Sequence, residues 1–141
     1  MHLETFTFHV ETAAGPDIRD ITGECARCAA ESGVRQGVLL VTSVGSTGSV
    51  TTIEFEPGAV ADFARALERL APPGADYAHE AAWHDGNGHS HVQAALVGPS
   101  LSVPVRDGRL VLGTWQQVVL VNHDVRPRRR RVAVTVLGTA G

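Results

Sequence analysis

The chain has 141 residues, a hydrophobic content of 43% and a formal net charge of −3. These values are typical of a globular protein, and we expect one domain over residues 1–141. The acidic balance, with a pI near 6.1, argues against nucleic acid or an acidic membrane as a partner, because both attract clustered Lys and Arg. No run approaches the ~20 apolar residues of a membrane span, and the N-terminus lacks a signal-peptide pattern, so we expect a cytoplasmic protein.

The N-terminal segment predicts a strand followed by a helix. Residues Leu3–Val10 alternate threonine with phenylalanine, a pattern typical of a half-buried strand. From Pro16 to Gly33 the apolar spacing of three and four predicts a helix that glycine ends. The residues expected on its buried face are Ile18, Ile21, Cys25, Cys28 and Ala29.

Two β-branched segments and an amphipathic helix follow. The runs Val38–Val44 and Val50–Phe55 predict strands, and the short Gly/Ser segment Gly45–Gly48 between them predicts a hairpin. Ala59–Leu70 carries apolar residues along one helical face and charged residues along the other. The residues predicted to face inward are Val60, Phe63, Leu67 and Leu70.

The second half of the chain is rich in strands. From Pro73 to Gly88 no clear period appears, and a loop of this length is more often functional than idle. A short helix is predicted at His91–Val97, and Asp107–Gly108 is a strong hairpin signal. The predicted strands are 101–105, 109–112, 115–121 and 132–137. Together the elements predict an α+β domain with a mainly antiparallel sheet or sandwich and two to three helices.

Cys25 and Cys28 form a C-x-x-C pair, which could be redox-active or half of a zinc site. No second such pair exists, and the surrounding pattern is helical, so we interpret both as small core residues. A structural zinc site usually has four closed ligands that include cysteine, and these cysteines are distant in sequence from the histidines.

Four of the seven histidines lie within thirteen positions of one another: His79, His84, His89 and His91. Neutral imidazole is a common ligand of zinc and similar ions, which need three or four converging ligands. The spacing matches no motif such as H-E-x-x-H. The residues alone therefore leave two interpretations open, a metal or phosphate site and a solvated polar loop.

An ordered set of short motifs runs through the second half. Its members are Tyr77 with His79, then His91, Gly98, Pro104–Val105, Gly113–Gln116 and the arginines from Arg128. In this order the set resembles the C-terminal half of the YjbQ-type family (UPF0047), described as secondary thiamine-phosphate synthases. The resemblance implies a single YjbQ-like domain and a transferase that joins a hydroxymethylpyrimidine diphosphate to a thiazole phosphate.

The resemblance also implies roles for particular residues. His79 and His91 would hold a divalent metal ion, zinc or magnesium, or act in proton transfer, and Glu54 is a third catalytic candidate. The residues expected to bind a small phosphorylated molecule are Ser46, Thr47, Thr114, Trp115, Gln116, Arg128 and Arg130. The family's subunits are similar to trimer-forming domains, so a homotrimer is expected.

Three of these sets also have an ordinary structural interpretation. Ser46 and Thr47 would belong to a plain hairpin loop, and Trp115 would fill the core while Gln116 satisfies a backbone group. The arginine run would protect an edge strand against aggregation. In a strand, Arg128 and Arg130 share the face of the valines that follow, and two guanidinium groups on one face suit a diphosphate.

Two positions depart from the family pattern. Gly45 stands where the family has a histidine, and Asn122 where it has a glutamate. A positioned acid or base typically contributes about 10²- to 10⁴-fold in rate. The departures therefore predict weak or absent thiamine-phosphate synthesis, and the alternative is a non-catalytic trimer that binds a small phosphorylated ligand or a metal.

Overall fold

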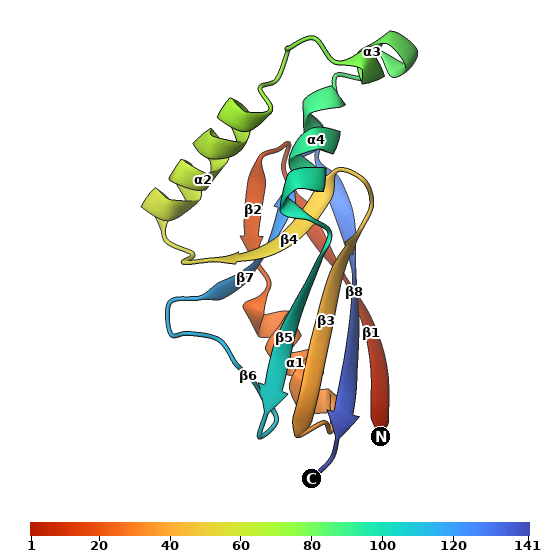
Figure 1. The fold of residues 1–141 in the computed structure, drawn as a ribbon, viewed down its shortest axis with the longest axis vertical. Helices are drawn as coiled ribbons and strands as arrows, with labels where there is room; N and C mark the ends of the chain where they lie inside the picture. Colours follow the sequence, from red (N-terminus) through yellow and green to blue (C-terminus); the bar gives the residue numbers. More distant parts are fainter.

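A computed structural model describes residues 1–141 and shows two antiparallel sheets and four helices (Figure 1). The five-stranded sheet has the order β1-β8-β3-β5-β6, and the three-stranded sheet has the order β2-β7-β4. The strands are β1 (His2–Thr12), β2 (Asp17–Asp20), β3 (Gln36–Val44), β4 (Gly48–Ile53), β5 (Ser100–Arg106), β6 (Arg109–Leu110), β7 (Gln117–Asn122) and β8 (Arg128–Thr139). The helices are α1 (Thr22–Ser32), α2 (Pro57–Leu70), α3 (Ala78–Trp83) and α4 (Gly88–Val97). The predicted α+β class is confirmed, with one helix more than expected.

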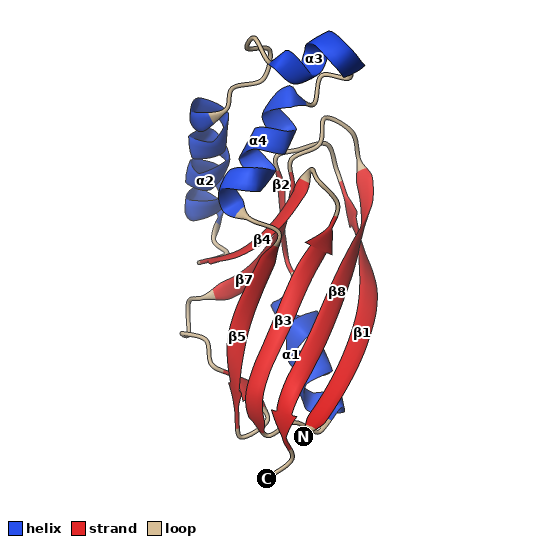
Figure 2. Cartoon of the chain, turned by 45° about the vertical axis from the view of Figure 1, so that its right-hand side comes forward, coloured by secondary structure: helices blue, strands red, loops and turns tan.

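The main core lies between the two sheets and α1, and β7 is buried on both faces. Val118 and Leu120 belong to this core, whereas Val119 and Val121 pack with Leu67 of α2 in a second cluster. Successive side chains of a strand point to opposite faces, which explains the split. Helices α2, α3 and α4 gather at one end of the sheets (Figure 2). No helix has the length and apolarity that a membrane crossing requires.

The predicted helix at residues 16–33 begins later than expected. Asp17–Asp20 forms β2, which pairs with β7, and the helix starts at Thr22. Ile18 lies in the α2 cluster and Ile21 in the main core, so the two side chains face different cores and share no helical face. The C-terminal end was predicted correctly, because Gly33 ends α1 at φ 76°.

Cys25 and Cys28 are fully buried and unpaired on the core side of α1. Burial, followed by the neighbouring Cys28, raises the pKa of the Cys25 thiol to about 12. The thiols therefore stay protonated at neutral pH, which supports the interpretation of both as core residues.

The predicted β3–β4 hairpin is wrong. β3 pairs with β5 and β8 in the five-stranded sheet, whereas β4 pairs with β7 in the other sheet. The segment from Gly45 to Thr47 therefore carries the chain from one sheet to the other, and we call it the crossing turn. The Asp107–Gly108 hairpin is confirmed, since β5 and β6 pair across it.

Candidate metal centre and its polar support

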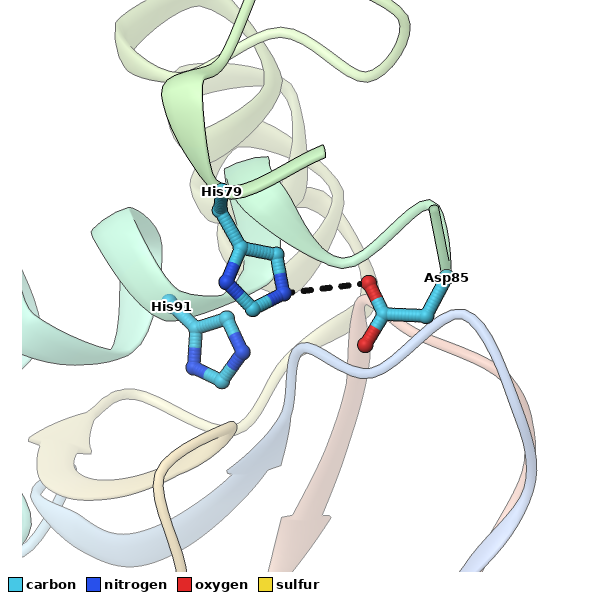
Figure 3. A group of neighbouring side chains, drawn as sticks. All are labelled: His79, Asp85 and His91. Atoms are coloured by element: carbon cyan, nitrogen blue, oxygen red, sulfur yellow. Dashed lines mark hydrogen bonds and ion pairs between the residues drawn. The ribbon is translucent and has the colours of Figure 1, made fainter. Parts of the chain in front are cut away.

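Helices α3 and α4 bring two histidines and an aspartate together. His79 lies on α3, Asp85 in the loop after it and His91 on α4, and their side chains converge (Figure 3). The two imidazole ring centres are 4.5 Å apart, and His79 Nε2 lies 3.1 Å from Asp85 Oδ1. One ligand atom from each residue lies within 4.8 Å of the other two. We call this group the His–Asp cluster.

The loop between α3 and α4 is held in shape by its own hydrogen bonds. The Glu80 carboxylate accepts the N–H groups of Gly86 and Gly88, at 2.8 and 2.9 Å. Gly88 starts α4 directly against Tyr77, where a Cβ would lie 2.5 Å from the Tyr77 Cβ. Glycine is thus required at position 88. The hydrogen bonds to Glu80 hold the loop so that Asp85 lies beside His79.

The cluster offers two imidazole nitrogens and one carboxylate oxygen. A hydrogen bond from the Asn87 backbone N–H, the largest effect, lowers the pKa of Asp85 and outweighs its desolvation, so the carboxylate is ionised at neutral pH. Three protein ligands of this kind plus one open position are typical of catalytic zinc, whereas magnesium prefers oxygen ligands throughout. Both histidines are half-buried and Asp85 is exposed, so one side of the cluster faces solvent.

A buried polar network connects the His–Asp cluster to the end of β7. Asn87 donates its N–H to Asp85 and its side-chain amide to Asp124, at 3.0 and 3.3 Å. Asp124 also accepts hydrogen bonds from Thr47 Oγ1 and from Arg128, whose Nη2 lies 2.9 Å away. Burial alone would raise the pKa of Asp124, but hydrogen bonds from the Arg126 N–H, Arg128, Thr47 and Asn87 lower it overall. Asp124 is therefore a buried anion that joins the cluster to the crossing turn.

His123 forms a second branch of this network. Gln93 Nε2 donates to the carbonyls of Leu67 and Ala71, so its Oε1 is left to accept from His123 Nδ1 at 3.0 Å. His123 Nε2 then accepts the Ser49 hydroxyl at 2.7 Å. Burial, with Arg130 and His89 adding to it, lowers the pKa of His123 to about 4. The neutral ring thus links α4, α2 and β4 as a structural support.

The arginines of β8 lie as the strand period predicts. Arg130 is buried on the valine side, Arg128 is half-exposed, and Arg129 points to the opposite face. The edge-strand interpretation is wrong, because β8 lies between β1 and β3. The structure therefore brings Arg128 and Arg130 close to Thr47 of the crossing turn. Ser46, also in this turn, is exposed.

Other candidates lie elsewhere in the chain. Glu54 follows the far end of β4, six residues or about 20 Å along the strand from Gly48 and the crossing turn. Thr114, Trp115 and Gln116 lie in the loop before β7, away from the His–Asp cluster (Figure 1). Trp115 is 73% exposed, so the prediction that it fills the core is wrong. Gln116 does satisfy a backbone group, the N–H of Gly113.

Sequence reasoning missed several polar residues that the fold gathers. Asp85 sits in an Asp-Gly-Asn-Gly turn, a composition that signals a loop but no ligand. His89 was expected in a loop, but it is buried on α4, where burial lowers its pKa. Asn87 and Asp124 meet across 37 residues of sequence, a contact that no local pattern announces.

Comparison with known proteins gives the family. A family model described as "UPF0047 protein YjbQ-like" matches residues 6–139. The chain belongs to the YjbQ/UPF0047 family. A UPF0047 protein of Archaeoglobus fulgidus is 39% identical over 128 residues, which cover 91% of this chain and 97% of the relative. The UPF0047 protein YugU of Bacillus subtilis is 31% identical, with coverage of 94% and 98%.

Solved structures give the same YjbQ-like fold. A hypothetical protein from Aeropyrum pernix superposes with a TM-score of 0.90 at 34% identity, covering 96% of this chain and 99% of that one. A YbjQ-like protein of unknown function from Sulfolobus solfataricus gives a TM-score of 0.87 at 28% identity, covering 98% and 100%. The arrangement of sheets and helices is therefore that of the family.

Proposed function

We propose that this YjbQ-like protein binds zinc at the His–Asp cluster together with a small phosphorylated molecule. The observation that carries the proposal is the convergence of His79, Asp85 and His91 on one partly open point. Two nitrogen ligands, one ionised carboxylate and an open fourth position match a catalytic zinc site. Zinc held there would act as a Lewis acid toward a phosphate oxygen.

The phosphate side of the proposal rests on the arginines near the cluster. A chain of hydrogen bonds runs from Asp85 through Asn87 and Asp124 to Arg128. Arg128 is thus connected to the His–Asp cluster through two intervening residues. Arg128 is half-exposed and can turn one edge of its guanidinium toward solvent. Guanidinium groups bind phosphate oxygens through paired N–H donors.

The reaction we propose is thiamine-phosphate synthesis at a low rate. A new bond would join the pyrimidine methylene to the thiazole nitrogen, and the diphosphate would leave with the electrons of the broken C–O bond. Arg128 would hold the departing diphosphate. No free acid or base stands at Gly45, and Asn122 is fully buried with its amide donating to the carbonyls of Ala13 and Arg126.

Complementation of a thiamine-requiring strain tests this reaction. We expect the unaltered chain to restore growth weakly or not at all, because the groups at Gly45 and Asn122 that would typically give about 10²- to 10⁴-fold each are missing. The variants Gly45→His and Asn122→Glu should be run beside it, with thiamine phosphate measured in extracts.

Strong rescue by the unaltered chain that His91→Ala abolishes would show that the two departures are harmless. Absence of rescue by every version would contradict the synthase reaction and leave the second candidate, a non-catalytic protein that keeps the ligand site. The buried, fully bonded Asn122 favours this candidate, because it acts as a structural residue.

We also propose that the protein is a homotrimer with α4 and the Gly113–Gln116 loop near the subunit boundary. On α4, Val92 and Leu96 are 40% and 63% exposed, one turn apart on the helix that carries His91. Trp115 adds a large exposed aromatic surface. Such apolar surface is typical of subunit contacts.

Light scattering at micromolar concentration should therefore return three times the chain mass of 14.9 kDa. Introducing charge with the double variant Val92→Asp/Leu96→Asp should shift the mass to that of one chain, because it places carboxylates in an apolar contact. The matched change Thr5→Asp, on the exposed side of β1, should leave the mass unchanged. A stable monomer for the unaltered chain would rule out the trimer.

A further inference from the structure

Beside the crossing turn, the chain buries a positive charge that no carboxylate contacts. Arg130 is 6% exposed, and its Nε and Nη2 donate to the neutral oxygens of Asn122 and Thr47. The nearby Asp124 already pairs with Arg128. Burying a guanidinium without an anionic partner costs several kcal/mol in general. Arg130 therefore lacks a direct anionic partner, and only the nearby Asp124 favours its charged form.

The other hydrogen-bond donors around Arg130 have no acceptor within the chain. Arg130 Nη1 donates to no group of the chain. The backbone N–H groups of Gly45, Ser46 and Thr47 also find no acceptor within the chain. Gly45 has φ 144°, and a Cβ there would lie 3.1 Å from Arg130 Nη1. Glycine thus leaves Nη1 open beside a turn whose successive N–H groups are free, an arrangement that suits an anion.

A buried hydroxyl on the other side of the guanidinium is also unpaired. Ser43 is 1% exposed, and its Oγ makes no hydrogen bond. A Cβ on Gly48 would lie 2.5 Å from Ser43 Oγ and 3.3 Å from Arg130 Cζ, so the hydroxyl and the guanidinium approach each other across the glycine. Buried hydroxyl groups almost always have partners. The polar groups around Arg130 are therefore incompletely paired on this side as well.

We propose that the crossing turn and Arg130 form an oxyanion site, the turn site, that binds one phosphate group without any metal. Arg130 Nη1 and up to three N–H groups of the turn would donate to it. Phosphate offers three or more acceptor oxygens to such a set, whereas a carboxylate offers two. The biological meaning rests on the proposed function, in which this phosphate belongs to the small phosphorylated ligand.

Arg128 extends the turn site toward the His–Asp cluster. It lies two residues from Arg130 on the same face of β8, about 7 Å along the strand. A diphosphate can span this separation, with one phosphate at the turn site and the other beside Arg128. The substrate class that the two arginines favour is therefore a diphosphate ester over a monophosphate.

Calorimetric titration of inorganic phosphate and pyrophosphate into the protein, in EDTA at low ionic strength, tests the turn site. We expect saturable binding of both, tighter for pyrophosphate, and a loss of about tenfold or more in affinity for Arg130→Gln. Arg129→Gln is the matched control, since it removes the same charge from the opposite face of β8, where Arg129 pairs with Glu11. Absence of saturable binding, or an equal loss in both variants, would overturn the proposal.

A second pair of variants tests the turn site independently of whether Arg130→Gln folds. Gly45→Asp and Gly45→Asn impose the same strain at φ 144° and nearly the same volume, but only the aspartate brings a carboxylate to Arg130 Nη1. We expect phosphate affinity to be about tenfold or more lower in Gly45→Asp than in Gly45→Asn, while the melting temperature of Gly45→Asp is at least as high, because its carboxylate pairs with Arg130. Equal affinities in the two folded variants would contradict the turn site. Because EDTA removes metal, phosphate binding without zinc binding would refute only the metal centre, and zinc binding without phosphate binding only the turn site.

Discussion

Replacing His91 by alanine should lower the zinc affinity of the protein by about 100-fold or more, equivalent to about 3 kcal/mol. The physical reason is that His91 supplies one of only three converging ligands, the others being His79 and Asp85. Loss of a residue that merely orients a ligand typically costs about 10- to 100-fold, so loss of a ligand should reach at least the upper end. Competition with a chromophoric chelator measures the affinity directly.

The control for this experiment is His84→Asn. His84 ends α3 at φ 50° and lies outside the His–Asp cluster, and asparagine tolerates this left-handed conformation. Zinc affinity should be unchanged in this variant. If the control loses as much affinity as His91→Ala, or if the unaltered protein binds no zinc, the metal centre is wrong.

The free energy of unfolding should fall by about 2 kcal/mol between pH 7 and pH 4.5 because of His123 alone. Its pKa is about 4 in the folded protein, against an ordinary value of 6.5, owing mainly to burial. Between these values the unfolded chain takes up a proton that the folded chain excludes. The stability contributed by the neutral ring is therefore full above about pH 6.5 and is lost as the pH falls toward 4.

Urea unfolding of His123→Gln at pH 7, 5.5 and 4.5 checks this expectation. Glutamine can hydrogen-bond to Ser49 and Gln93 without titrating, so the decline with falling pH should be flatter by about 2 kcal/mol, although the variant is less stable at pH 7. His9→Gln, an exposed change on β1, should keep the full decline. An unaltered decline in His123→Gln would show that His123 is not the titrating group. Asp124 acts in the same direction at lower pH, since its pKa is also lowered.

The local sequence pattern predicted the elements whose tertiary contacts follow the same pattern. β1 and α2 were found because most apolar residues of each lie toward one buried side, although Leu70 at the end of α2 is exposed, and β3 was found as a continuous β-branched run. The same reasoning failed at residues 17–21, where Ile18 and Ile21 are three apart but face two different cores. It failed again for β3 and β4, because which sheet a strand joins is decided by pairing with β7 and β8, far away in sequence.

The candidate site was predicted only where a motif carried it. His79 and His91 came from the family resemblance, and the arginine side of β8 came from the strand period. Asp85 and Asp124 could not be foreseen, because a tethered loop delivers the first and a long-range contact with Asn87 defines the second. The exposed Trp115 could not be predicted either, because the local sequence does not distinguish an aromatic residue of the core from one on the surface.

The three ligands of the His–Asp cluster come from one continuous segment, residues 79–91, which the sheets do not interrupt. Helix α3, which has no buried residue, can open by itself while the strands and α4 stay in place. Ion release would then require only the local free energy of opening α3, which carries His79. Zinc would stabilise this end of the molecule without adding to the stability of the core, so the segment could exchange its ion within an intact fold.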